Sequence, residues 1–133
     1  MSRFAAVTWA VKPGFDEELA QLFANYPRPD SYIVRDEAGN QVGAVLSTVV
    51  FLKDERIVRV IEYDGDLPAV MRHMAGQRSV RDLEEQMERY LEVPRDTSTP
   101  GAFRDFFISH SMRCLVARRH DQPAEGTAVG VVA

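Results

Sequence analysis

The sequence predicts an α+β fold of the ferredoxin-like type, in which an antiparallel sheet carries its helices on one face. The first observation behind this prediction is the order of hydrophobic patterns along the chain, which is β-α-β-β-α-α-β. The second is size, because 133 residues with 45% apolar content suit one compact domain with a substantial core. The third is that the longest predicted strand is apolar on both sides, so each side needs a cover.

The first half of the chain predicts three strands and one helix. Residues 3–11 are an apolar run of strand formers closed by Lys-Pro-Gly. Apolar residues at helical spacing follow behind an acidic first turn, and two prolines between residues 26 and 30 end this helix. A hairpin comes next, with strands at 41–53 and 55–63 around a tight turn at Asp54.

The second half predicts two longer helices, a short aromatic helical segment and a last strand. Asp66 is placed to cap the first helix, and Ser79 with Asp82 resembles a capping box for the second. Thr99, followed by proline, is placed to cap the aromatic segment. Residues 112–118 are the predicted last strand.

We expect one domain at residues 1–119 and a disordered C-terminal tail at 120–133. The tail mixes glycine with small residues and has no helical period.

The strand at 41–53 also predicts a homodimer. Simple alternation places apolar residues on both of its sides, with one side formed by Val45, Val49 and Phe51 and the other by Leu46, Val50 and Leu52. Helices cover one side of the sheet, and a second copy of the sheet would cover the other, giving a dimeric α+β barrel packed face to face. The alternative is that the chain's own C-terminal segment provides this cover.

Composition excludes several functional classes. The formal net charge is −4 and the basic residues are dispersed, so a nucleic-acid interface is not expected. The sequence shows neither a signal-peptide layout nor an apolar run near the roughly 20 residues needed to span a bilayer, so we expect a cytoplasmic protein with no membrane contact. No nucleotide or metal motif occurs, so we expect no cofactor and no metal. Cys114 fits a buried structural thiol better than a nucleophile.

Two histidines are candidate acid–base groups, because histidine is the side chain most often used in that role. His73 lies beside the apolar stripe of a predicted helix, where it fits either a structural hydrogen bond or a general base at a pocket. His110 ends the aromatic segment, where it can cap the last carbonyls or contact substrate.

Arg59 lies within an apolar alternation and must therefore find an anion, since it cannot lose its charge. Tyr63 shares its strand face. The candidate partners of Arg59 are Asp96, in a structural pair that ties its segment to the sheet, Asp30, or an oxygen atom of a substrate. Asp96 also belongs to a Pro-Arg-Asp-Thr-Ser-Thr-Pro stretch that is a candidate wall of the binding site.

Aromatic residues supply the remaining candidate binding contacts. Trp9 is either core or ligand platform, and with Tyr63, Phe103 and Phe106 it can wall a flat slot of aromatic size.

Three stretches together resemble one known family. They are the Ala-Val-Met-Arg-His-Met-Ala-Gly-Gln-Arg-Ser-Val-Arg run at 69–81, the Tyr-Leu-Glu-Val-Pro-Arg-Asp-Thr-Ser-Thr-Pro-Gly run at 90–101 and Met-Arg-Cys at 112–114. This pattern is similar to the SchA/CurD-like domain of actinomycete aromatic polyketide pathways. The resemblance implies a role in type II polyketide biosynthesis, in spore-pigment or antibiotic assembly.

Three functions stay open, and the residues favour the first, a polyketide cyclase acting on a poly-β-keto or polycyclic aromatic intermediate. A polyketide cyclase would use His73 as the base, with Arg59 or Tyr63 holding the developing oxyanion. A cofactor-independent monooxygenase would use the same base and the same apolar slot. A non-catalytic partner would bind a pathway intermediate or other polyketide synthase components.

Overall fold

The computed structural model describes residues 2–120, and they form an α+β domain. Its strands are β1 (Arg3–Ala10), β2 (Ile33–Arg35), β3 (Gln41–Lys53), β4 (Arg56–Gly65) and β5 (Ser111–Met112). Its helices are α1 (Asp16–Asn25), α2 (Leu67–Gly76), α3 (Arg78–Met87) and α4 (Pro100–His110), with a 3₁₀ turn at Glu88–Tyr90.

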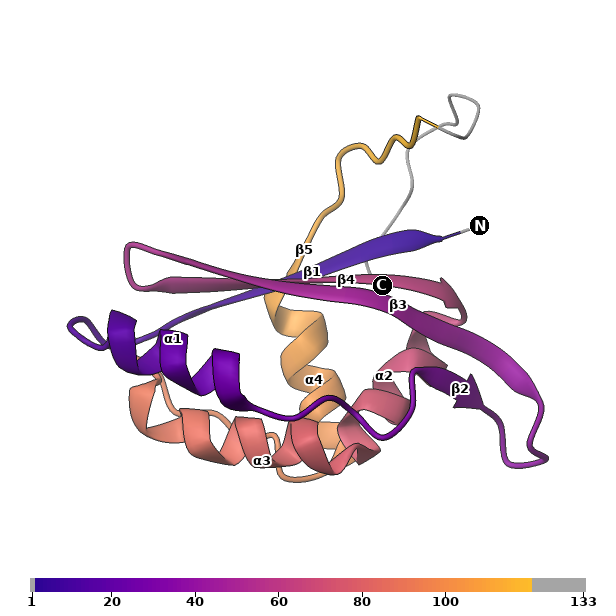
Figure 1. Cartoon of the computed structure of the whole chain (residues 1–133), viewed down its shortest axis with the longest axis horizontal. Helices are drawn as coiled ribbons and strands as arrows, with labels where there is room; N and C mark the ends of the chain where they lie inside the picture. Colours follow the sequence, from indigo (N-terminus) through magenta and orange to yellow (C-terminus); the bar gives the residue numbers. More distant parts are fainter. Residues whose placement is uncertain (1, 121–133) are drawn as a thin grey trace.

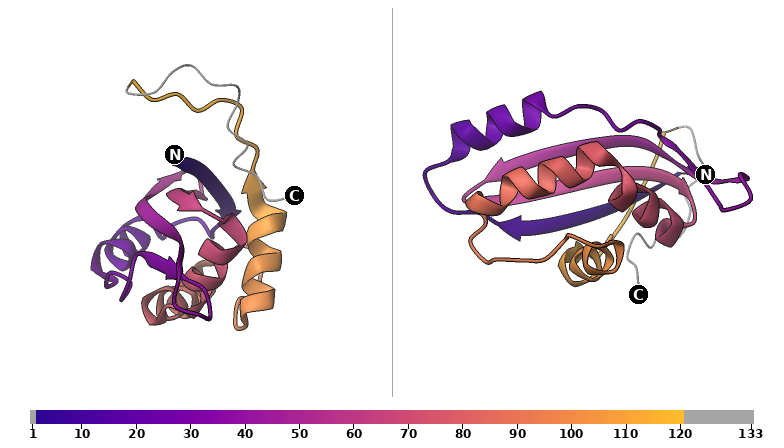
Figure 2. Two further views of the ribbon diagram at one scale, coloured as in Figure 1. Left: turned by 90° about the vertical axis from the view of Figure 1, so that its right-hand side faces the viewer. Right: turned by 90° about the horizontal axis from the view of Figure 1, so that it is seen from below.

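The strands form one antiparallel sheet in the order β2-β3-β4-β1-β5. All four of these helices lie on one face of the sheet, as predicted (Figure 1). The two further views show the same separation into a sheet layer and a helix layer (Figure 2). The α+β prediction is therefore confirmed, and the order of elements is compatible with the predicted ferredoxin-like arrangement.

Helix caps were predicted correctly at two of three places. The side chain of Asp66 accepts a hydrogen bond from the Ala69 amide at 3.1 Å, and Thr99 accepts one from the Ala102 amide at 3.1 Å. The capping box at Ser79 is wrong, because α3 already begins at Arg78 behind an N-cap at Gln77. Ser79 lies inside the first turn, where its hydroxyl is buried.

Two strands differ from prediction. The short edge strand β2 has only three residues and was not predicted. The last strand is two residues long and not seven, because only Ser111 and Met112 pair with β1. Beyond Met112 the chain leads away from the sheet on the side opposite the helices (Figure 1). Its apolar residues are strand formers, but their backbone lies beside no strand of the sheet with which it could pair. Leu115 is 73% exposed, and Cys114 is half-buried, not buried as predicted.

A β-bulge in β3 overturns the predicted strand faces. Val45 pairs with Tyr63 and Ser47 pairs with Glu62, so Leu46 is an extra residue between two ladder pairs. The bulge shifts the alternation by one residue, and Val45 therefore faces the helices while Val49 faces away from them. Simple alternation had placed these two valines on the same side.

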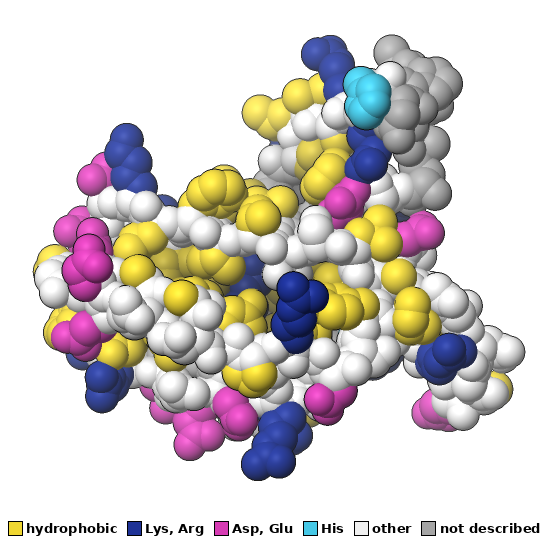
Figure 3. All heavy atoms as spheres, in the orientation of Figure 1, with side chains coloured by type: hydrophobic (Ala, Val, Ile, Leu, Met, Phe, Trp, Pro, Cys, Tyr) yellow, Lys and Arg dark blue, Asp and Glu magenta, His cyan; other side chains and the backbone are white. Residues whose placement is uncertain are grey.

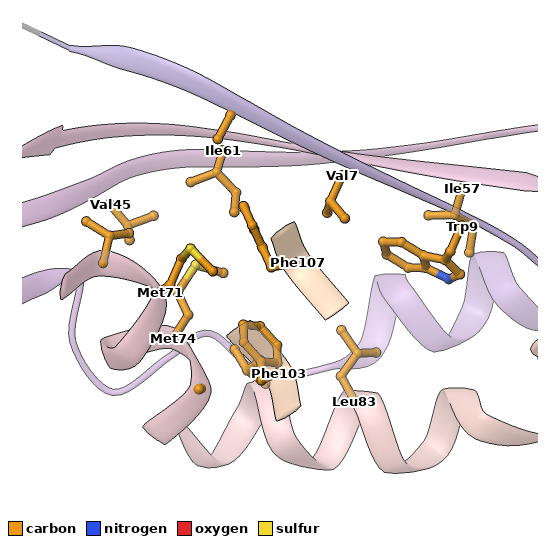
Figure 4. Packing of buried hydrophobic residues seen from close by; sticks show 14 of the residues in the cluster. Val7, Trp9, Val45, Ile57, Ile61, Met71, Met74, Leu83, Phe103 and Phe107 are labelled. Carbon is orange, nitrogen blue, oxygen red and sulfur yellow. The ribbon is translucent and has the colours of Figure 1, made fainter. Parts of the chain in front are cut away.

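The inner face of the sheet and the helices enclose one hydrophobic core. Figure 4 shows side chains from β1 and β4 pointing toward those of α2, α3 and α4. Phe103 and Phe107 of α4 are 5% and 3% exposed, and Leu83 of α3 is fully buried. The strands β3 and β4 approach each other closely at Val42 and Gly65. A Cβ on Gly65, whose φ is +90°, would lie 2.2 Å from the Val42 carbonyl oxygen.

None of the helices among residues 2–120 lies over the outer face of the sheet. Phe51 is 61% exposed and Val49 is 46% exposed. This is the surface that a second copy was predicted to cover, and the homodimer stays a prediction. No helix among residues 2–120 has the length and apolar character needed to cross a membrane. A disordered tail is predicted at residues 120–133. Residues 121–133 of this tail lie outside the described part of the chain.

Candidate functional site

A cleft of about 480 Å³ opens where the helices leave the inner face of the sheet uncovered. Its lining comes from the loop between α1 and β2, from β3 and β4, and from the junction of α2 with α3. The residues that line it are Tyr26, Pro27, Arg28, Pro29, Ser31, Tyr32, Val45, Leu46, Ser47, Thr48, Arg59, His73, Met74, Gln77 and Val80. Figure 3 shows this side of the molecule hollowed, with hydrophobic side chains around the hollow and lysine or arginine atoms within it.

The loop wall of the cleft, residues 26–32, is held by two side chains at the end of α2. His73 Nε2 lies 2.6 Å from the Ser31 carbonyl oxygen. The side-chain oxygen of Gln77 accepts hydrogen bonds from the Asp30 and Ser31 amides, at 2.9 and 3.4 Å. Pro27 and Pro29 restrict the backbone between these contacts and α1. The wall is therefore positioned by α2.

The contact with Ser31 also determines the tautomer of His73. A carbonyl oxygen only accepts hydrogen bonds, so Nε2 must carry the proton. In the neutral ring Nδ1 is then unprotonated and able to accept a proton. His73 thus makes the structural hydrogen bond that was one of its two interpretations, and it also lines the cleft.

Arg59 reaches the cleft from β4, and its side chain is only 6% exposed. Its guanidinium lies 3.8 Å from Glu84 of α3, and over the ring of Trp9 at 5.8 Å from the centroid. With the residues that the structure describes, this guanidinium makes no hydrogen bond. A buried arginine with five N–H donors is thus held in place by one carboxylate and one ring.

Glu84 is shared with a second arginine, Arg95, which follows Pro94 in the segment between α3 and α4. Arg95 makes a close hydrogen-bonded ion pair with Glu84, and its guanidinium lies over Phe106 at 4.0 Å and over Trp9 at 5.1 Å. Burial lowers the pKa of Arg95 from its ordinary value, Glu84 raises it, and repulsion from Arg59 lowers it further. We call Arg59, Glu84 and Arg95 the buried arginine cluster.

The predicted pairing of Arg59 with Asp96 or Asp30 is wrong, because its carboxylate partner among the described residues is Glu84. Asp96 is exposed, and its carboxylate accepts hydrogen bonds from the amide and hydroxyl of Ser98, which hold its pKa below the ordinary value. Glu84 takes the place of Asp96 because α3 packs over β4 with this residue on its buried side. The sequence carried this signal, since Glu84 lies four residues after Val80 on the apolar stripe of α3.

The other predicted site residues lie outside the cleft lining. Tyr63 and Phe103 belong to the core, at 1% and 5% exposed, and burial raises the pKa of the Tyr63 phenol. Trp9 is also core, and Phe106 packs edge-on against it with ring centroids 6.0 Å apart. His110 stacks on Phe106 and contacts the Phe106 carbonyl oxygen at 3.1 Å, which is the capping interpretation of this residue. The structure thus brings together only His73 and Arg59 at the cleft.

Sequence reasoning missed the loop wall. Tyr26 and Tyr32 flank a Pro-Arg-Pro stretch, and the prolines were interpreted only as the end of a helix. Two aromatic residues beside a proline-stiffened segment are typical of a surface that contacts a ligand.

The cleft combines apolar and aromatic lining with a histidine and a buried arginine, and its size suits a small organic molecule. Within residues 2–120 no group of three His, Cys, Asp or Glu is placed to hold a metal ion. Fold and cleft together define a small α+β domain with a cleft large enough to admit an organic molecule.

The chain belongs to the family described as SchA/CurD like domain, whose sequence model matches residues 2–119. It is 36% identical over 121 residues to "Polyketide synthase CurD" of Streptomyces cyaneus, covering 90% of this chain and 31% of that protein. It is 37% identical over 107 residues to the "42.8 kDa protein in whiE locus" of Streptomyces coelicolor, covering 80% and 25%. It is 34% identical over 122 residues to "Protein SchA" of Streptomyces halstedii, covering 92% and 30%.

The chain therefore spans between a quarter and a third of the length of these curated relatives. No solved structure matches it.

Proposed function

We propose that this chain works in aromatic polyketide biosynthesis as a cyclase of a poly-β-keto or polycyclic aromatic intermediate. Family membership and the relative named as a polyketide synthase support the pathway. The observation that carries the reaction is that His73 and Arg59, a base and an oxyanion donor, line the same cleft.

The chemistry needs few groups. His73 Nδ1 takes a proton from the methylene between two carbonyls, breaking a C–H bond and leaving an enolate. The enolate carbon attacks a second carbonyl of the same chain and forms the ring C–C bond. The carbonyl oxygen becomes an alkoxide, which Arg59 stabilises, and the imidazolium returns the proton to it. Loss of water from the resulting alcohol then leads to the aromatic ring.

The cleft would contribute mainly by orientation. A flexible poly-β-ketone has several methylenes and carbonyls that can react, and the wall held by His73 and Gln77 limits how it can fold. The apolar lining excludes water that would otherwise compete for the oxyanion donor.

The test is turnover of a synthetic aryl 1,3,7-triketone, whose methylene between two carbonyls can close a six-membered ring on the third carbonyl. The purified 133-residue chain is incubated with it in air and under nitrogen, and product masses are recorded. We expect faster ring formation than in buffer under both gases and a product lighter than the substrate by one water. His73→Gln should slow it by about 100-fold or more, the usual contribution of a positioned base. His110→Gln is the matched control, because this histidine is exposed at the end of α4 and lies outside the cleft.

Two other results would replace the proposal with one of the functions left open by the sequence. A product heavier by one oxygen atom, formed only in air, would indicate the cofactor-independent monooxygenase. Binding of the triketone without any acceleration, unchanged in His73→Gln, would indicate a non-catalytic partner.

A further inference from the structure

The buried arginine cluster holds more positive than negative charge. Arg59 and Arg95 share Glu84, so two guanidinium groups face one carboxylate, with side chains 6%, 9% and 6% exposed respectively. The next acidic group that acts on Arg95 is Glu88, which is exposed to solvent. A buried cation without a matching anion is costly, because burial removes the water that would solvate it.

Unused hydrogen-bond donors accompany this surplus charge. Arg95 Nη1 and Trp9 Nε1 are buried and have no hydrogen-bond partner among the described residues. Arg59 belongs to the cluster and also lines the cleft, and within residues 2–120 its polar contact is the ion pair with Glu84. Arg59 is therefore the member of the cluster through which the surplus charge can meet a ligand.

The lining of the cleft has the same sign. Among the described residues that line it, Arg28, Arg59 and His73 are basic and none is acidic. The whole chain carries a formal net charge of −4, so this sign does not follow from composition. A cleft that combines apolar walls with positive charge favours an apolar molecule bearing one negative charge.

We propose that the cleft selects organic anions of aromatic size, with the negative charge on oxygen at Arg59, and that Arg95 strengthens this selection from behind without touching the ligand. The inference rests on the proposed function, which defines the class of molecule that enters the cleft. It adds that this molecule binds in its negatively charged form. A carboxylate of a free polyketide acid and an ionised enol of a β-diketone share this chemistry. A neutral amide or ether of the same shape does not.

Binding of unreactive probes tests the inference without any turnover. Isothermal titration at pH 7.5 compares 1-naphthoate with 1-naphthamide, and 5-phenylcyclohexane-1,3-dione, an ionised enol at this pH, with its enol methyl ether. We expect each anion to bind about tenfold or more tightly than its neutral match, the usual gain for hydrogen bonds to a charged group. Whichever of the two anions binds more tightly shows whether the cleft prefers a carboxylate or an enolate.

Variants distinguish the contributions of Arg59 and Arg95 to anion binding. Arg59→Met should remove the preference for anions, and Arg95→Met should reduce it several-fold although Arg95 is absent from the cleft lining. Arg95→Lys keeps the charge and should restore most of the preference, which guards against an effect of misfolding. Arg104→Met, on the exposed side of α4 beside Asp105, is the matched control and should change nothing.

Equal binding of anions and neutral matches would overturn the inference, as would an Arg95→Met variant with an undiminished preference. Either result would leave the cyclase proposal standing if the triketone still turns over. Conversely, selective anion binding by a chain that does not accelerate ring formation would retain this inference and reject the cyclase.

Discussion

The two faces of the sheet are built from alternate residues of the same strands, yet they differ in almost every physical respect. The inner face is covered by helices, buries the arginine cluster and borders the cleft. The outer face is covered by none of the described helices and exposes Val49 and Phe51. Its charged side chains lie toward the strand ends, with Glu62 accepting a hydrogen bond from Ser2 at one end of β4 and Arg56 donating one to Thr8 at the other. Charge is therefore buried where the proposed chemistry needs it and kept at the periphery where a flat apolar surface remains.

The largest expected effect tests the inner face. Glu84→Gln leaves two buried guanidinium groups without their carboxylate, and we expect it to lower the free energy of unfolding by about 3–5 kcal/mol. Urea denaturation measures this change. Glu85→Gln, on the exposed side of the same helix, is the control and should stay within about 0.5 kcal/mol of the native chain.

Replacing either arginine of the cluster should lower the free energy of unfolding less than replacing Glu84 does. Arg59→Met or Arg95→Met leaves one arginine paired with Glu84, so each should cost less than about 1 kcal/mol. Equal losses for all three variants would show that the cluster has no surplus charge, and the contrast between the two faces would weaken.

The next effect tests the outer face. The outward rows of three strands supply its apolar area: Phe4 and Ala6 of β1, Val58 and Val60 of β4, and Val49 and Phe51 of β3. Two such sheets can pack face to face at about 10 Å, so a second copy is the occupant we expect. Phe51→Asp would place an unpaired carboxylate in that interface and should convert the homodimer to a monomer.

Light scattering after size exclusion measures the mass. The monomeric Phe51→Asp variant should still fold, because the side chain is 61% exposed within one chain. Val93→Asp, at a similarly exposed aliphatic residue in the segment between α3 and α4 rather than on a strand, should leave the mass unchanged. A native chain that is itself monomeric would contradict the homodimer.

The smallest expected effect concerns pH. A hydrogen bond from Ser2 and the pairing with Arg119 lower the pKa of Glu62 below its ordinary value of 4.5, although burial acts in the opposite direction. A carboxyl group with a lowered pKa stabilises the fold above pH 4.5 and loses this contribution as the pH falls through its folded pKa. Glu62→Gln should therefore be less stable than the native chain at pH 7, by about 0.5 kcal/mol for a partly exposed pair.

Urea midpoints at pH 7 and at pH 3 check the sign. The gap between native chain and variant should shrink on acidification. A gap of the same size at both pH values would show that Glu62 contributes by packing, and the outer face would then hold no ionic contribution of this kind.

Sequence patterns predicted what depends on local signals. Asp66 and Thr99 are caps whose partners lie three residues away, and both were found. Arg59 was identified because an arginine within an apolar strand pattern must find an anion. Its partner was not, because that choice depends on how α3 packs over β4, and the stripe position of Glu84 was overlooked.

The cleft was only half predictable for the same reason. His73 and Arg59 were selected as candidates, and the structure brings both to one cleft. Phe103 and Trp9 were proposed for their aromatic character, and Tyr63 also because it shares the strand face of Arg59. Both features suit a core equally well, and the core is where these residues lie. The loop wall requires knowing that α2 ends beside residues 26–32, a long-range contact that no local pattern shows.

The extra residue in β3 has a consequence for how chain length can vary in this family. Leu46 pairs with nothing across the ladder, so its deletion would leave Val45 opposite Tyr63 and Ser47 opposite Glu62. Deletion of a paired residue of β3 would instead turn every side chain on one side of the deletion to the opposite face of the sheet. Leu46 also borders the cleft. Gain or loss of a residue here would reshape the cleft while the pairing of the sheet stays as it is, so the bulge is a place where the shape of the cleft can change without cost to the sheet.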